Sequence, residues 1–188
     1  FLITNFDIHD RYVVDALVRA DGSSLFGEDE RRQWYYRVGG AWRLSQESFF
    51  RAPWVDELKL RYSVGTAGGR PAFDAQYETF TIESGNVVPN RLGNRKLKPE
   101  HATEHEAGVD VSLFDYRVAL TLTHARTTTT NQILRVPLPS YTGYVDQWRN
   151  AGTLESRTWE ATLDLRLVER PAFSWSARVL FDATKTRI

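Results

Sequence analysis

The chain has 188 residues, a formal net charge of zero and an isoelectric point near 7.1. This balance supplies no basic field to recruit nucleic acid, and the absence of cysteine excludes disulfide frameworks, thiolate zinc sites and cysteine nucleophiles. No uninterrupted apolar run approaches the roughly 20 residues that a membrane-spanning helix needs, so the sequence excludes a helical membrane protein.

Alternation of apolar and polar side chains predicts β-strands along most of the chain, because successive side chains of a strand point to opposite faces. A short strand is expected over residues 2–8. The apolar members of the next strands, in chain order, are Tyr12, Val14, Ala16 and Val18; Trp34, Tyr36, Val38, Trp42 and Leu44; Leu58, Leu60, Tyr62 and Val64; Ala107, Val109, Val111 and Leu113; and Val118, Leu120 and Leu122.

The last forty residues show the most regular alternation. One predicted strand presents Trp159, Ala161, Leu163, Leu165 and Leu167 on one face and Thr158, Glu160, Thr162, Asp164 and Arg166 on the other. After a turn at residues 169–172, the pattern resumes with Phe173, Trp175, Ala177, Val179 and Phe181. This pattern predicts a β-hairpin with one apolar and one charged face.

The connections alternate in length. Residues 9–10, 115–116 and 169–172 form short joins, whereas residues 21–33, 67–102 and 130–152 are long and rich in Gly, Pro, Asn and charge. Residues 45–56 are an exception on the short side, a longer turn that carries Phe49, Phe50 and Trp54 and is expected at the membrane interface. In an up-and-down meander the long joins then share one end, as in outer-membrane barrels.

The sequence therefore predicts an all-β fold, an antiparallel up-and-down meander of about eight long strands. Tyr and Trp near the ends of several apolar stripes are typical of interfacial aromatic girdles, and the strands are long for a sandwich. Two alternatives stay open on the pattern alone. A complete eight-stranded barrel would pair its first and last strands, and a soluble β-sandwich carbohydrate-binding module would bury the apolar stripes between two sheets.

Several motifs in collinear order resemble the SusC/RagA-type TonB-dependent outer-membrane transporters. The first is R-x-D-G-S-S-x-F-G at residues 19–27, followed by W-x-x-S-x-E-x-F from residue 42 and then the strand at residues 58–65. L-K-P-E from residue 97 and E-x-G-x-D from residue 106 come next, and then G-Y at 143, N-x-G at 150 and Glu160. The motif positions are Arg19, Asp21, Gly22, Ser23, Ser24, Phe26, Trp42, Glu47, Arg61, Gly65, Pro99, Glu100, Glu104, Gly108, Asn150, Gly152 and Glu160.

The resemblance implies that residues 1–188 are a partial segment from the later part of a β-barrel of about 22 strands. We see no signal peptide, plug domain, TonB box or barrel C-terminus, so both ends are expected to be cut. The resemblance further implies a transporter in the outer membrane of a Gram-negative bacterium, embedded in lipid. It would import oligosaccharides or peptides with a SusD-like lipoprotein and be powered through TonB, contacts that would involve parts absent here.

No catalytic, cofactor or metal site is predicted. His101-Ala102-Thr103-Glu104-His105 matches the H-x-x-E-H string of zinc proteases, but it follows Pro99 and precedes a strand instead of lying on a helix. Acidic residues near Asp21 lack the spacing of a calcium loop and are interpreted as a turn. The candidate substrate contacts are aromatic residues of the long connections, since aromatic faces stack on sugars and peptides; the alternative is a role in the barrel rim or in contacts to a lid protein. These candidates are Tyr77, Phe80, Tyr141, Tyr144 and Trp148.

Overall fold

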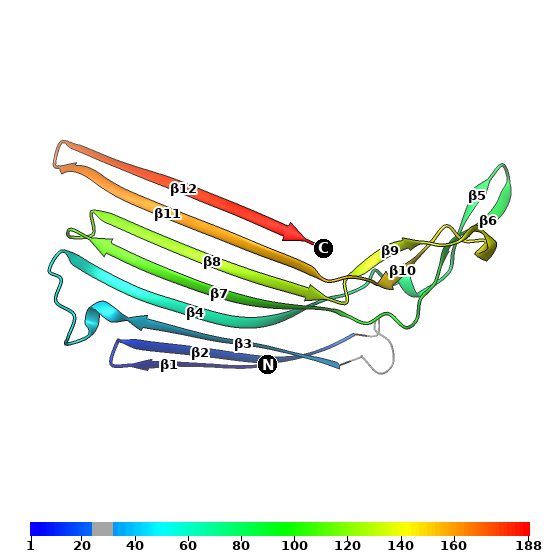
Figure 1. The fold of residues 1–188 in the computed structure, drawn as a ribbon, viewed down its shortest axis with the longest axis horizontal. Helices are drawn as coiled ribbons and strands as arrows, with labels where there is room; N and C mark the ends of the chain where they lie inside the picture. Colours follow the sequence, from blue (N-terminus) through cyan, green and yellow to red (C-terminus); the bar gives the residue numbers. More distant parts are fainter. Residues whose placement is uncertain (24–31) are drawn as a thin grey trace.

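The computed structural model describes residues 1–23 and 32–188 and places eight strands side by side in one antiparallel sheet (Figure 1). Each strand is hydrogen-bonded to the next in the order β1-β2-β3-β4-β7-β8-β11-β12. The strands are β1 (Leu2–Ile8), β2 (Tyr12–Gly22), β3 (Arg32–Arg43), β4 (Val55–Gly69), β7 (Glu100–Leu113), β8 (Val118–Thr130), β11 (Leu154–Arg170) and β12 (Phe173–Arg187). In these described ranges, no helix is long and apolar enough to cross a membrane.

The connections lie as their lengths predict. Tight turns join β1 to β2, β7 to β8 and β11 to β12 at one end, and the connections from β4 to β7 and from β8 to β11 lie at the opposite end (Figure 1). The first two tight turns use left-handed backbone: His9 and Asp10 have φ of 55°, and Phe114, Asp115 and Tyr116 have φ of 57–59°. The longer turn between β3 and β4 contains the 3-10 helix η2 (Leu44–Gln46), and its Trp54 stacks on Phe114 at 6.2 Å. The predicted meander is confirmed.

A second sheet was not anticipated. Residues expected to form two loops, 67–102 and 130–152, instead contribute four short strands: β5 (Thr79–Glu83), β6 (Asn86–Leu92), β9 (Ile133–Pro137) and β10 (Asp146–Asn150). They pair in the order β5-β6-β10-β9, with β10 parallel to β6. We call this unit the loop sheet; it extends beyond the end of the large sheet, together with the 3-10 helices η3 (Phe73–Gln76) and η4 (Ser140–Thr142) (Figure 1).

The apolar stripes remain uncovered, which contradicts both alternatives to a partial barrel. Trp159, Phe173 and Val179 are 47%, 59% and 56% exposed, whereas a sandwich would bury them under a second sheet. Among the described residues, the buried hydrophobic side chains are Tyr35, Ala75 and Leu97, and Pro71 and Pro99 are buried as well. The large sheet is also open, since β1 and β12 are its two ends and do not pair with each other. A complete eight-stranded barrel would require that pairing.

Two details of the predicted strands need correction. The alternation expected through Leu167 breaks between Arg166 and Val168, where the register shifts and Val168 pairs with Trp175. Such a bulge lets an extra residue enter one strand and changes which face follows. In addition, β7 begins at Glu100, so the segment around His101, expected to be a solvated loop, is already strand.

Candidate lumen wall and loop sheet

Charged side chains pair across neighbouring strands on the face opposite the apolar stripes. Arg61 of β4 makes a two-pronged contact with Asp110 of β7, from Nε to Oδ2 at 3.0 Å and from Nη2 to Oδ1 at 3.1 Å. Lys59 Nζ lies 2.8 Å from the same carboxylate, and Arg61 also reaches Glu106 at 3.5 Å. Cross-strand pairs of opposite charge stabilise a sheet. We call this face the lumen wall.

The lumen wall is hollowed. Arg37, Gly65, Ala67, Glu104 and Glu106 are among the residues that line one hollow of about 400 Å³. A second hollow, lined in part by Asp15, Arg37, Gly39 and Arg61, adjoins it through shared residues. The wall therefore presents mixed charge and backbone polar groups, which suit a hydrated solute or a polar protein surface better than lipid.

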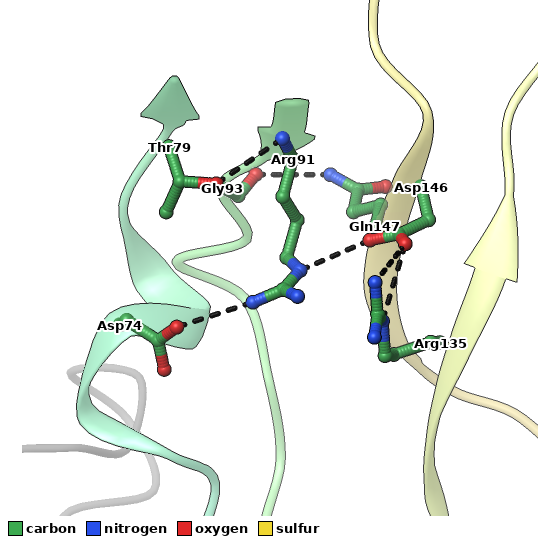
Figure 2. A network of polar contacts seen from close by, with 7 residues as sticks. All are labelled: Asp74, Thr79, Arg91, Gly93, Arg135, Asp146 and Gln147. Atoms are coloured by element: carbon green, nitrogen blue, oxygen red, sulfur yellow. Dashed lines mark hydrogen bonds and ion pairs between the residues drawn. The ribbon is translucent and has the colours of Figure 1, made fainter. Parts of the chain in front are cut away.

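Asp146 organises the loop sheet. Its carboxylate lies between two arginines from different loops: Arg91 Nε donates to Oδ1 at 3.0 Å, and Arg135 donates to Oδ2 from Nε at 3.1 Å and also from Nη2 (Figure 2). Arg91 also reaches Asp74 Oδ2 at 3.1 Å. Asp146 is 8% exposed. A carboxylate at this burial needs charged partners, so the network couples the two long connections.

The electrostatics of Asp146 follow from this placement. The hydrogen bonds from Arg135 lower the pKa of the Asp146 carboxyl, those from Arg91 add to the effect, and burial opposes it. The carboxylate therefore stays charged at neutral and mildly acidic pH. Both guanidinium groups also lie over the Trp148 ring, at 5.4 Å for Arg91 and 5.9 Å for Arg135. Cation–π contacts of this kind hold the two arginines in place.

Amide side chains complete the connection between the loops. Asn150 Nδ2 donates to the carbonyls of Lys98 and Asn131 at 2.8 Å, and its Oδ1 accepts from Lys98 N at 2.9 Å. Asn94 Nδ2 donates to Trp148 O at 2.8 Å. Gly93 accepts from Gln147 Nε2 at 2.9 Å, and a Cβ at position 93 would lie 2.7 Å from the backbone of residues 76 and 77. Only glycine permits that close approach.

The five predicted aromatic contacts all lie in the loop-sheet region but do not line one cavity. Tyr141 of η4 is 88% exposed, and Tyr77 and Phe80 are also exposed. Tyr77 packs against Phe73 with ring centroids 5.5 Å apart. Tyr144 and Trp148 are half-buried, and the Trp148 ring is engaged by the two arginines. Tyr141, Tyr77 and Phe80 therefore offer the most accessible rings, and their role in substrate contact stays a prediction.

Several motif positions have structural roles at the turn end and on the wall. Glu47 accepts from Tyr12 Oη at 2.5 Å and from Trp42 Nε1 at 2.9 Å, which ties the β3–β4 connection to β2 and β3. The hydrogen bond from Tyr12, followed by that from Trp42, lowers the pKa of Glu47. Gly108 lies beneath Arg61, since a Cβ there would be 2.7 Å from Nη2. Nothing in the structure explains why Gly65 must be glycine.

Other motif positions mark the ends of strands near the long connections. Arg19 pairs with Asp21 at 3.1 Å and lies over the Tyr35 ring, and Gly22 and Ser23 follow at the end of β2. Pro99 is buried, and Glu100 Oε1 accepts from Ile133 N at 2.7 Å. The remaining positions have these places: Thr127 donates to Glu104, Gly152 has a φ of 88°, Glu160 faces Asp182, and Ser24 and Phe26 lie outside the described residues.

The two histidines of the H-x-x-E-H string contact different aromatic partners. His101 stacks on Tyr35 at 6.4 Å, and His105 Nδ1 is 2.8 Å from Tyr62 Oη. Within residues 1–23 and 32–188, no group of three or more His, Cys, Asp or Glu side chains is arranged to hold a metal ion. The H-x-x-E-H string is therefore part of strand β7, and its two histidines contact tyrosines of β3 and β4.

No local pattern in the sequence indicates the network around Asp146. Asp146 and its partner Arg91 are 55 residues apart and lie in connections that showed no strand alternation. A clue was available in composition, since the two long connections together carry five arginines and five acidic residues. That clue predicts charge pairing between loops, but not the parallel contact of β6 with β10.

Comparison with known proteins places the whole chain among receptor barrels. The family described as "TonB dependent receptor-like, beta-barrel" matches residues 1–187. TonB-dependent receptor P26 of Formosa agariphila is 27% identical over 194 residues, covering 98% of this chain and 20% of that protein. TonB-dependent receptor SusC of Bacteroides thetaiotaomicron is 25% identical over 187 residues, covering 91% of this chain and 18% of that protein.

Solved structures agree in fold. A chain of the RagAB peptide importer in its closed-closed state matches with a TM-score of 0.86 at 22% identity, over 98% of this chain and 21% of that chain. The siderophore receptor PirA from Pseudomonas aeruginosa matches with a TM-score of 0.68 at 18% identity, over 97% of this chain and 33% of that chain. The chain spans about a fifth of the length of the curated relatives it matches.

Proposed function

Because the chain belongs to the family of TonB-dependent receptor-like β-barrels, we propose that it forms part of the wall and outer loops of a transporter in the outer membrane of a Gram-negative bacterium. Residues 1–188 would form one segment of a barrel of about 22 strands. The observation that carries the proposal is the two-faced open sheet, apolar and exposed on one side and charge-paired on the other. Such a sheet fits lipid outside and an aqueous lumen inside.

The same placement supports a role in uptake. The lumen wall would line the path of a hydrated solute, and the loop sheet would meet that solute first at the outer mouth. In the complete protein, a SusD-like lipoprotein would deliver the substrate and TonB would supply energy. The substrate class is an oligosaccharide or a peptide, and the RagAB peptide importer, which shares the fold, is described as carrying peptides.

Uptake by the complete receptor tests this proposal. A strain lacking the receptor gene is complemented with the full-length gene, and uptake of labelled oligosaccharides and labelled peptides is measured with TonB present and depleted. We expect TonB-dependent uptake of one class. Failure of the receptor to reach the outer membrane, or uptake of neither class from broad mixtures, would contradict the proposal.

Loop variants test the aromatic candidates in the same assay. Tyr141→Ser removes the most exposed tyrosine of the loop sheet, and Tyr116→Ser removes an exposed tyrosine from the turn at the opposite end. If Tyr141 stacks on substrate, Tyr141→Ser lowers uptake about 5- to 160-fold, the effect of losing about 1–3 kcal/mol of stacking. Tyr116→Ser leaves uptake unchanged. Equal uptake by both variants would remove Tyr141 from the substrate path.

A further inference from the structure

The outer face of β8, β11 and β12 changes character at the same level on all three strands. Strand register places the residues of each row directly opposite one another. Going toward the long connections, the successive rows are Leu122, Ala161 and Phe181; then His124, Trp159 and Ala183; then Arg126, Arg157 and Lys185. The face therefore changes from apolar to aromatic to cationic over four residues along each strand, since successive rows are two residues apart.

The third row sets three like charges side by side. Neighbouring strands lie about 4.8 Å apart, so the three cations fall within about 10 Å. Like charges directly opposite one another destabilise a sheet. Glu155, one step further along β11, offsets part of this repulsion, because its carboxylate lies 3.1 Å from Arg126 Nη2 and 2.7 Å from Arg157 Nη2. Three cations and one carboxylate leave a net charge of +2, to which Arg187, opposite Glu155, adds one.

The cationic row also lies next to an aromatic row, on the side of the long connections. Trp159 stacks on His124 at 4.2 Å in the row before it, and Trp side chains are enriched at the headgroup level of a membrane. One further step along each strand is two residues, or about 7 Å. The side chains of Arg126 and Arg157 are about half exposed, and Glu155, Arg157, Lys185 and Arg187 line a small hollow between them. The cations are therefore accessible on the lipid side, at the end that carries the long loops.

We propose that Arg126, Arg157 and Lys185 bind the phosphate groups of a lipid headgroup in the outer leaflet. Guanidinium groups match phosphate oxygens in pairs, and a dianionic phosphate would offset two of the three net positive charges. The proposal rests on the proposed function, because it needs the apolar face to lie in the outer membrane. A free phosphate has the same chemistry, but the position of the row beside the aromatic girdle on the lipid side favours the lipid.

Lipid binding by the complete receptor tests the proposal. The receptor is purified in detergent and stripped of lipid, and native mass spectrometry measures its affinity for bis-phosphorylated lipid A and for the same lipid with both phosphates removed. The test variant is Arg126→Gln/Arg157→Gln/Lys185→Gln. The matched control is Arg178→Gln, which removes a cation from the opposite face of β12, where Arg178 bonds Asp164 at 2.6 Å.

We expect the triple variant to bind bis-phosphorylated lipid A about 100-fold more weakly than the wild type, since each cation near a charged membrane surface contributes about a 5-fold effect. Arg178→Gln binds as the wild type does, and the lipid without phosphates binds all proteins equally weakly. A folded Arg157→Lys variant, which keeps the charge but loses the paired donors, shows an intermediate loss. This second variant keeps the test informative if the triple variant does not fold.

Two results would overturn the proposal: equal affinity of wild type and triple variant for bis-phosphorylated lipid A, or complete displacement of that lipid by excess inorganic phosphate, which would indicate a site for a soluble anion. The native mass spectrometry experiment measures lipid binding and not uptake, so its result is independent of the uptake assay of the proposed function. Loss of uptake with retained phosphate-dependent lipid binding would count against the proposed function alone, whereas normal uptake without lipid binding would count against the phosphate site alone.

Discussion

At the scale of single residues, Asp146 holds the loop sheet together, because its buried carboxylate is bonded by arginines from both long connections. We predict that Asp146→Asn raises the hydrogen exchange of β6, β9 and β10 amides by an amount equivalent to about 1–3 kcal/mol, the cost of leaving partners of a buried polar group unsatisfied. Asp74→Asn is the matched control, since Asp74 bonds the same Arg91 from an exposed position. Equal exchange in both variants would show that the network is not the support of the sheet.

The same carboxylate sets the acid limit of the loop sheet. Its pKa is lowered in the folded protein, so its contribution to stability is fully present above the ordinary value for aspartate, about 3.9, and is lost as the pH falls through the lowered folded value. We predict that exchange of the β10 amides, corrected for intrinsic rates, is unchanged from pH 7 to pH 5. Acid opening of the loop sheet between pH 6 and pH 5 would contradict this assignment.

Contacts could be predicted from the sequence where the two partners are close along the chain, and not where they are far apart. Glu47 lies five positions from Trp42, and one motif contains both partners of their hydrogen bond. Asp146 has its partner Arg91 55 positions away, on a strand that the sequence did not predict. Local patterns contain local partners, so the motif includes both Trp42 and Glu47, whereas no local pattern joins Asp146 to Arg91.

At the scale of elements, strand β11 carries two kinds of environment on its two faces. Leu163 lies opposite Leu120 and Val179 on the apolar face, while its neighbour Thr162 lies on the lumen wall. We predict that Leu163→Arg destabilises the complete receptor in lipid vesicles by about 2–4 kcal/mol, as expected for a cation near the bilayer midplane. Thr162→Arg, the matched control, costs well under that. Guanidinium titration measures both, and a larger cost for Thr162→Arg would reverse the assigned faces.

A strand could be predicted from the sequence where its two faces meet different environments. The long strands alternate because one face is apolar and the other polar, and this pattern predicted the meander and the ends at which the loops meet. The loop sheet has no such contrast: β10 reads Asp-Gln-Trp-Arg-Asn and pairs through charges and amides. The bulge near Leu167 was also missed, because the apolar pattern continues through it.

At the scale of the whole molecule, the large sheet is open and does not close into a barrel. Its outer strands β1 and β12 each have one unpaired edge, and large apolar side chains are exposed over one entire face. Open edges and wide apolar surfaces favour association with other chains or with lipid. The fold therefore makes physical sense as a segment of a larger barrel whose other strands cover both edges.

In the proposed barrel the apolar face of the large sheet contacts lipid and the charged face does not, and fluorescence quenching along β11 tests this directly. Single cysteines at residues 158–166 of β11, in a complete receptor without other cysteines, are labelled with a fluorophore and placed in vesicles that contain brominated lipid; the chain itself has no cysteine to remove. We expect quenching with a period of two residues, strong at 159, 161, 163 and 165 and weak at 158, 160, 162 and 164. Uniform quenching, or strong quenching at the even positions, would contradict it.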